Sequence, residues 1–179
     1  MVGIATSAAA TVNSTAGGFG HRCYLAAKLR DTSSQAIRSC NRALAEKALP
    51  RTDRVATYIN RGILHLHRSA TKKAAADFDR ALALDPSQPE AWLNKAILTV
   101  RIGGGAEALP MIQNALELKA RRPALAHYIR AIVEERRGNI RAAYDDFRRA
   151  QELEPNWQDP AVELRRFNVR QPRSKTSAA

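Results

Sequence analysis

The stretch AAADFDRALALDP at residues 74–86 recurs, with its key residues kept, as AYDDFRRAQELEP at residues 143–155. The shared positions are Ala74, Phe78, Ala81 and Pro86 in the first copy, and Ala143, Phe147, Ala150 and Pro155 in the second. Two weaker copies keep the same frame, at Ala36, Cys40, Ala43 and Ala48 and at Ala108, Ile112, Ala115 and Ala120. The leading alanines are 38, 34 and 35 residues apart, so the chain repeats itself about four times.

A period near 34 with this closing signature resembles the tetratricopeptide repeat, a helix–turn–helix unit. The resemblance covers about residues 20–156. The family's opening motif, W-x2-L-G-x2-Y, is only partly kept. Its leucine position holds Arg61, Lys95 and Arg130, and its last aromatic position is lost.

Helical periodicity begins near His21 and predicts an all-α fold. We expect helices at about 19–30, 33–47, 53–68, 71–84, 89–102, 105–119, 123–137, 140–153 and 158–168. The short linkers between them require antiparallel packing, and the alanines spaced seven apart on one face allow close approach. One helix pair cannot cover its own apolar face, so the pairs should stack into a solenoid, which the resemblance implies is right-handed.

The chain divides into three predicted parts. Residues 1–18 carry no charge and show no periodicity, so we expect them to be disordered. Residues 19–168 form the repeat domain, with repeats at about 19–50, 55–88, 89–122 and 124–157 and a capping helix at 158–168. Residues 169–179 should be a disordered basic tail.

The family resemblance also implies where a partner binds. First helices of such repeats line a concave groove that takes a peptide or a partner helix, and no chemistry of their own is expected. The predicted groove residues are Ile59, Asn60, Ile63, Leu66, Leu93, Asn94, Ile97, Val100, Arg101, Leu125, Tyr128 and Ile132. The Lys/Asn/Arg clamp that some relatives use for acidic peptide termini is incomplete here, so that ligand is not predicted.

The net charge of +12 comes from 29 basic and 17 acidic side chains and is spread along the chain. It predicts attraction to acidic partners at low salt. We expect a partner protein, for which the positive charge favours an acidic character, and a basic nucleic-acid-binding helical repeat is the alternative. Nucleic acid is the less favoured partner because only 6% of residues are aromatic and charge is not concentrated on one face. No stretch is apolar enough to span a membrane.

Two features concern the compartment. The start of the chain resembles the end of a signal peptide, and Ala8-Ala9-Ala10 would suit a cleavage site, although an ordinary loose terminus is the competing interpretation. Cys23 and Cys40 fall on the two helices of the first repeat, so a disulfide is favoured over two buried thiols. Together they suggest an exported or periplasmic protein, with the cytoplasm as the alternative.

No constellation in the sequence indicates catalysis, and we expect neither a cofactor nor a metal. His65 and His67 are two residues apart on a predicted helix, whereas metal-binding pairs on helices are four apart. Acidic pairs such as Glu134-Glu135 are surrounded by arginines and fit surface ion pairs better than catalytic carboxylates.

Overall fold

The computed structural model describes residues 7–12 and 18–167. Within these ranges the chain is helical and contains no β-strand. The helices are α1 Phe19–Leu29, α2 Ser34–Ala45, α3 Arg51–His67, α4 Thr71–Leu84, α5 Pro89–Arg101, α6 Gly105–Glu117, α7 Pro123–Arg136, α8 Ile140–Leu153 and α9 Gln158–Leu164. The predicted basic tail at 169–179 lies outside the described residues.

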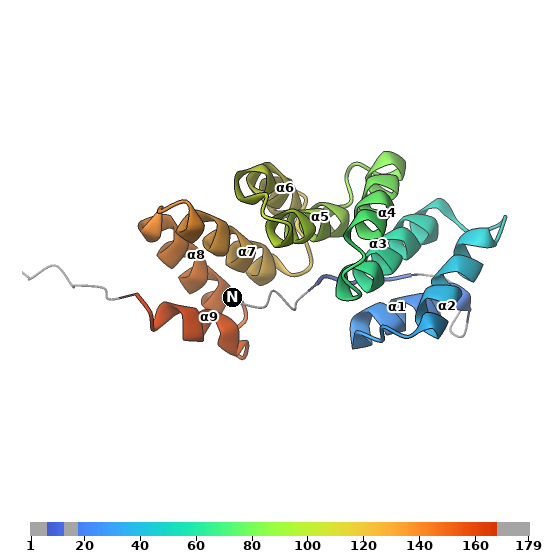
Figure 1. Ribbon diagram of the computed structural model, residues 1–179, viewed down its shortest axis with the longest axis horizontal. Coiled ribbons are helices and arrows are strands. Elements are labelled where there is room, and N and C mark those ends of the chain that lie inside the picture. The colour runs from blue at the N-terminus through green and yellow to red at the C-terminus, as the bar shows by residue number, and fades with distance from the viewer. Residues whose placement is uncertain (1–6, 13–17, 168–179) are drawn as a thin grey trace, which may run out of the picture.

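The helices pack as consecutive antiparallel pairs, α1 with α2, α3 with α4, α5 with α6 and α7 with α8. Each of α3, α5 and α7 also contacts the pair before it, so the pairs stack into a solenoid. Figure 1 shows this solenoid as an arc, with α4, α6 and α8 on its outer side and α3, α5 and α7 on its inner side. The predicted all-α solenoid is therefore confirmed.

Small residues set the distance within each pair. All six alanines that repeat in the second helices α4, α6 and α8 are fully buried, namely Ala74, Ala81, Ala108, Ala115, Ala143 and Ala150. On α3 the backbone comes so close to Phe78 that a Cβ at Gly62 would lie 2.5 Å from the ring atom Cε1. Phe78, Ile112 and Phe147 are themselves fully buried, which explains why the closing signature keeps a large apolar residue there.

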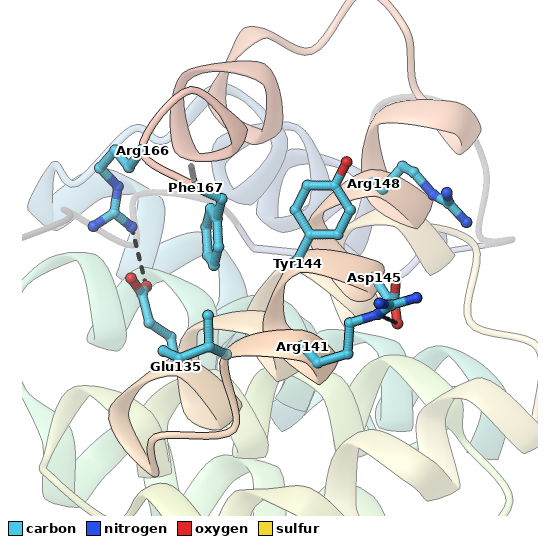
Figure 2. A pocket seen from close by; sticks show the side chains of 8 residues that line it. Glu135, Arg141, Tyr144, Asp145, Arg148, Arg166 and Phe167 are labelled. Atoms are coloured by element: carbon cyan, nitrogen blue, oxygen red, sulfur yellow. Dashed lines mark hydrogen bonds and ion pairs between the residues drawn. The ribbon is translucent and has the colours of Figure 1, made fainter. Parts of the chain in front are cut away.

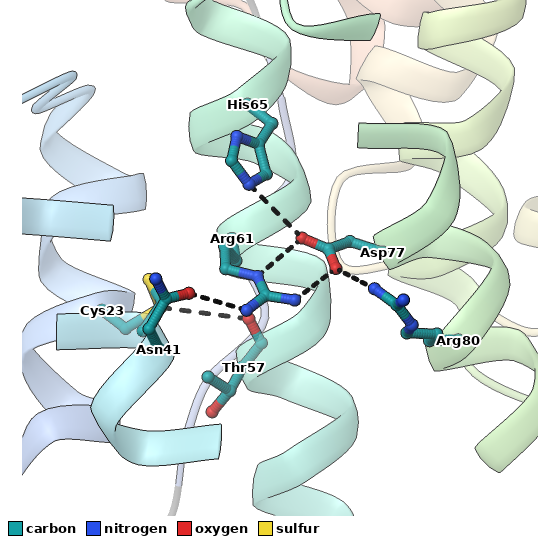
Figure 3. Close-up of polar contacts among 8 residues, drawn as sticks. Cys23, Asn41, Thr57, Arg61, His65, Asp77 and Arg80 are labelled. Carbon is teal, nitrogen blue, oxygen red and sulfur yellow. Dashed lines mark hydrogen bonds and ion pairs between the residues drawn. A yellow bond between two sulfur atoms is a disulfide. The ribbon is translucent and has the colours of Figure 1, made fainter. Parts of the chain in front are cut away.

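Two of the three departures from the family's leucine position, Arg61 and Arg130, form ion pairs between the two helices of a repeat. Arg61 donates from Nε and Nη2 to the two carboxylate oxygens of Asp77, over 2.8 and 2.7 Å (Figure 3). Arg130 does the same toward Asp146, with both distances 2.7 Å. Each arginine precedes its aspartate by 16 residues, so repeats two and four contain the same Arg–Asp ion pair. It takes the place of leucine packing at this position.

The Asp146 carboxylate has a second donor. Its Oδ1 lies 2.8 Å from His127 Nδ1. Burial acts to raise the pKa of Asp146, but the hydrogen bonds from Arg130 and His127 outweigh it, so the pKa lies below its ordinary value. The Asp146 carboxylate on α8 is thus held ionised by two donors from α7.

The C-terminal helix α9 is shorter than the predicted 158–168. It ends at Leu164, and the chain then turns so that the ring of Phe167 packs 5.8 Å from those of both Tyr144 and Phe147. Trp157, just before α9, packs 4.7 Å from Tyr128. The cap therefore covers the last pair with aromatic rings from its two ends, and packing of Phe167 replaces the final helical turn.

In the first repeat, a disulfide joins α1 to α2. The sulfur atoms of Cys23 and Cys40 are 2.07 Å apart and the Cα atoms 4.8 Å apart. Both side chains are fully buried. Cys40 takes the position that Phe78 takes in the next repeat, so the covalent bond stands where the other repeats pack a large apolar side chain.

Candidate functional site

The N-terminal segment Ser7–Val12 is not disordered, and the prediction for residues 1–18 was wrong for these six residues. The segment runs in an extended form between α1 and α3 (Figure 1). It contacts the inner side of the solenoid, where the sequence predicted a partner to bind. The remaining residues of that prediction, other than Gly18, lie outside the described part of the chain.

Two asparagines hold this segment by its main chain. Asn60, on α3, accepts a hydrogen bond from the N–H of Ala10 over 3.0 Å and donates to the Ala10 carbonyl over 2.7 Å. Asn94, on α5, accepts from the N–H of Ala8 over 3.3 Å and donates to the Ala8 carbonyl over 2.8 Å. Each amide side chain thus satisfies both polar groups of one peptide residue.

The spacing of these contacts links the two repeats in register. Asn60 and Asn94 are 34 residues apart, which is one repeat, and their partners Ala10 and Ala8 are two residues apart. Two residues is the period of an extended chain, so the residues between them face the other way. Successive first helices therefore present one amide each to alternate residues of the segment.

The side chains on the inward face of the segment are small and buried. Ala8 and Ala10 are each only 3% exposed, and both belong to the apolar core of the solenoid. Val12, next in the same alternation, also packs against this core and stays partly accessible. The segment is therefore part of the folded structure rather than a loose terminus.

The opposite face of the segment lines a basic pocket. A cavity of about 330 Å³ is bounded by Ser7, Ala9 and Thr11 of the segment and by residues of the solenoid. The solenoid residues are Tyr24, Ala27, Lys28, Arg30, Arg121 and Arg122. Four of these are cationic and none is acidic. Arg122 is also paired with Glu154 over 2.8 Å, so its charge is partly offset.

His67 lies at the start of the segment. Its Nε2 is 3.4 Å from the Ser7 hydroxyl, and its Nδ1 is buried without a hydrogen-bond partner among the described residues. Burial lowers the pKa of His67, and the nearby Arg30 and Arg101 lower it further. The ring is therefore neutral at neutral pH and adds no charge to the basic pocket.

The structure separates the predicted groove residues into two groups. The nine apolar members are buried, at Ile59, Ile63, Leu66, Leu93, Ile97, Val100, Leu125, Tyr128 and Ile132. The polar members make the directed contacts: Asn60 and Asn94 hold the segment, and Arg101 donates from Nη1 to the Leu66 carbonyl over 3.2 Å. Tyr128 packs against Phe147 and Trp157 and belongs to the core of the last repeat.

Sequence reasoning missed the segment and the basic wall beside it. Ser7–Val12 carries no long apolar run, and Lys28, Arg30, Arg121 and Arg122 come from segments far apart in the chain. The one signal present was the pair of asparagines at equivalent repeat positions. Polar side chains on an otherwise apolar helix face indicate a ligand with polar groups.

A second hollow lies at the other end of the solenoid, between α7, α8 and the C-terminal turn (Figure 2). It has a volume of about 740 Å³ and includes Tyr144, Phe167 and the half-exposed Ile140. Four of its charged groups form two pairs, since Arg141 contacts Asp145 at 3.0 Å and Arg166 contacts Glu135 at 3.0 Å. None of the predicted groove residues lines it.

Residues 7–12 and 18–167 contain no candidate for two further classes of site. No group of three or more His, Cys, Asp or Glu side chains there is placed to hold a metal ion. Among the helices in the same ranges, none combines the length and apolar character needed to cross a membrane.

Comparison with known proteins extends this description. No family model matches the sequence, and no curated protein matches it either. Solved structures do match. The crystal structure of MamA superposes with a TM-score of 0.62 at 20% identity, over 79% of this chain and 80% of that one. A thermophilic TPR protein from Thermus thermophilus gives a TM-score of 0.67 at 15% identity, over 83% of this chain and 78% of the other.

This chain has the tetratricopeptide-repeat fold. A third TPR match is the first TPR domain of Spaghetti (RPAP3), solved bound to the HSP90 peptide SRMEEVD. It superposes with a TM-score of 0.58 at 23% identity, over 63% of this chain and 88% of that domain. TPR domains are generally protein-binding modules.

Proposed function

We propose that this TPR protein is a non-enzymatic scaffold that binds an extended segment of a partner protein across α3 and α5. The observation that carries the proposal is the pair Asn60 and Asn94, each directed at both main-chain groups of one residue. Main-chain groups are common to all peptides, so a partner segment in the same form presents the same donors and acceptors.

An extended segment suits these contacts better than a helix. Residues inside a helix use their own N–H and C=O groups in intrahelical hydrogen bonds, so a helix offers the two amides no free pair. An extended chain leaves both groups of every second residue pointing the same way. The peptide-bound TPR domain of Spaghetti (RPAP3) supports binding of a peptide by this fold.

The test compares the double variant Asn60→Ala/Asn94→Ala with wild type in pull-downs from the source cell, followed by mass spectrometry. Asn156→Ala is the matched control, since Asn156 is exposed in the turn before α9. We expect one protein to be captured by wild type and control and lost with the double variant, whose circular dichroism stays helical. Equal capture by all three folded proteins would place the binding site elsewhere.

Nucleic acid is the second candidate, and the cations that line the basic pocket favour it. Phosphate contacts make affinity fall steeply with salt. Titration with fluorescent single- and double-stranded oligonucleotides distinguishes the two candidates. Saturable binding at physiological salt would support the nucleic-acid function, whereas binding only at low salt reflects the charge of +12 alone.

For the compartment we propose export to an oxidising environment, as the disulfide between Cys23 and Cys40 would require. The measurement is thiol counting under denaturing conditions without reductant, on protein taken from its native compartment. Zero free thiols with a monomeric mass support export. Two free thiols would place the protein in the cytoplasm.

A further inference from the structure

The segment Ser7–Val12 occupies the proposed binding groove as a ligand would, so its side chains report what the groove accepts. Its residues alternate between two different surroundings. Ala8 and Ala10 are buried in the solenoid core, and Ser7, Ala9 and Thr11 line the basic pocket, where Ala9 also packs against the edge of the core. These two surroundings make separate chemical demands on a partner.

The inward positions accept only small side chains. Ala8 and Ala10 are held against α5 and α3 by hydrogen bonds between 2.7 and 3.3 Å long, which fix the distance between the segment and the helices. Both residues are 3% exposed at this distance. A larger side chain would overpack the contact or break the asparagine hydrogen bonds.

The outward positions face cations. Lys28, Arg30, Arg121 and Arg122 bound the same cavity as Ala9 and Thr11, with no carboxylate in its lining. The chain's own segment offers this wall only a methyl group and hydroxyls. A carboxylate at either of these two positions would add an attraction that the segment lacks.

We infer that the groove selects an extended partner segment with small side chains at two alternate positions and carboxylates at the positions beside them. The chain's own Ser7–Val12 satisfies the first demand and not the second, so it is a placeholder that a better matched segment displaces. This inference rests on the proposed function and adds the partner's side-chain pattern to it.

The experiment uses the full chain carrying Ala8→Glu/Ala10→Glu, in which two carboxylates prevent the segment from entering its buried positions. Three fluorescent peptides are compared by anisotropy. The first has the sequence of residues 6–13, TSAAATVN, with Ala9→Asp and Thr11→Asp. The second carries asparagine in place of the aspartates. The third keeps the aspartates and adds Ala8→Leu and Ala10→Leu.

We expect the aspartate peptide to bind at least about tenfold more tightly than the asparagine peptide at low salt, with the difference shrinking as salt screens the charges. The leucine peptide should bind at least about tenfold more weakly than the aspartate peptide. Adding Asn60→Ala/Asn94→Ala to the Ala8→Glu/Ala10→Glu chain should abolish binding of all three peptides. The wild-type chain should bind the aspartate peptide more weakly than the Ala8→Glu/Ala10→Glu chain does. The reason is that the wild-type segment competes for the groove at high effective concentration.

Hydrogen exchange on the wild type checks the placeholder directly. The amides of Ala8 and Ala10 should be protected, and Asn60→Ala/Asn94→Ala should remove that protection while the helices keep theirs. Unprotected amides in wild type would overturn the placeholder. A wild-type dimer that dissociates when the asparagines are replaced would instead show that the segment comes from a second copy.

The failures of the two proposals are distinguishable. Equal binding of the leucine and aspartate peptides overturns the small-residue demand, and equal binding of the aspartate and asparagine peptides overturns the charge demand. Both results leave an asparagine-dependent groove intact. Absence of any peptide binding, alongside asparagine-dependent capture of a partner, overturns this inference and not the proposed function.

Discussion

The ion pair between Arg61 and Asp77 gives the most specific prediction about the fold. The Asp77 side chain is 2% exposed and the Arg61 side chain 16%, so both charges are largely removed from water. Removing one partner of a buried pair costs about 3–5 kcal/mol, because the other charge stays buried and unpaired. Either Asp77→Leu or Arg61→Leu alone should therefore lower the free energy of unfolding by about 3 kcal/mol, at the low end because the guanidinium keeps some solvent contact.

The double variant Arg61→Leu/Asp77→Leu should behave differently. It places leucine where the family motif has it and leaves no buried charge, and such replacements are often neutral or stabilising. Its stability should lie within about 1 kcal/mol of wild type. Arg80, which also contacts Asp77 at 3.4 Å, is 58% exposed and returns to water at little cost.

Urea unfolding followed by circular dichroism measures all four proteins. With an m-value of about 2 kcal/mol/M, each single variant should lose about 1.5 M in its midpoint and the double variant less than about 0.5 M. The m-values should stay equal. A double variant as unstable as either single variant would refute the argument, since it would mean that the position requires charge rather than volume.

Three further expectations concern packing, pH and the disulfide. Ala81→Leu should overpack the α3–α4 contact and cost about 1–3 kcal/mol in urea unfolding, while Ala142→Leu on the exposed face of α8 changes little. The pKa of Asp146 is lowered by folding, so its contribution to stability is present above its unfolded value of about 4 and is lost as pH falls below it. In urea unfolding between pH 6 and pH 3, the free energy of unfolding of Asp146→Asn should therefore fall less than that of wild type. Reduction of the bond between Cys23 and Cys40, 17 residues apart, should lower stability by about 3 kcal/mol, and no change in the midpoint on adding reductant would show that the bond is absent in solution.

The repeat architecture was predictable because it depends on local spacing. Ala74 and Ala81 are seven residues apart and so lie on one face of α4, whatever that face packs against. The structure buries both residues fully. The roles of Arg61 and Lys95 were not predictable from their repeat position. The repeat pattern in the sequence identifies that position. The ion-pair partner of each side chain depends instead on which carboxylate the fold brings near it. Arg61 finds Asp77 within its own repeat, and Lys95 finds Asp79 of the preceding one at 2.7 Å.

The segment Ser7–Val12 was missed for a different reason. Its burial does not come from its own composition but from Asn60 and Asn94, which are 50 and 86 residues away from their partners. A short, uncharged stretch has no periodicity long enough to predict structure by itself. Only contacts of high sequence separation order it, and a single sequence does not reveal them.

The alanines that the asparagines hold are the same alanines that suit a signal-peptidase site. Cleavage after Ala10 would leave Thr11 as the new N-terminus and remove Ala8 and Ala10 from the groove. A protease needs its substrate accessible, and these residues are 3% exposed in the folded chain, so the cut has to come before the segment seats itself. Processing during export would then deliver a protein with its groove already vacant, whereas a chain that escaped processing would fold with the groove closed.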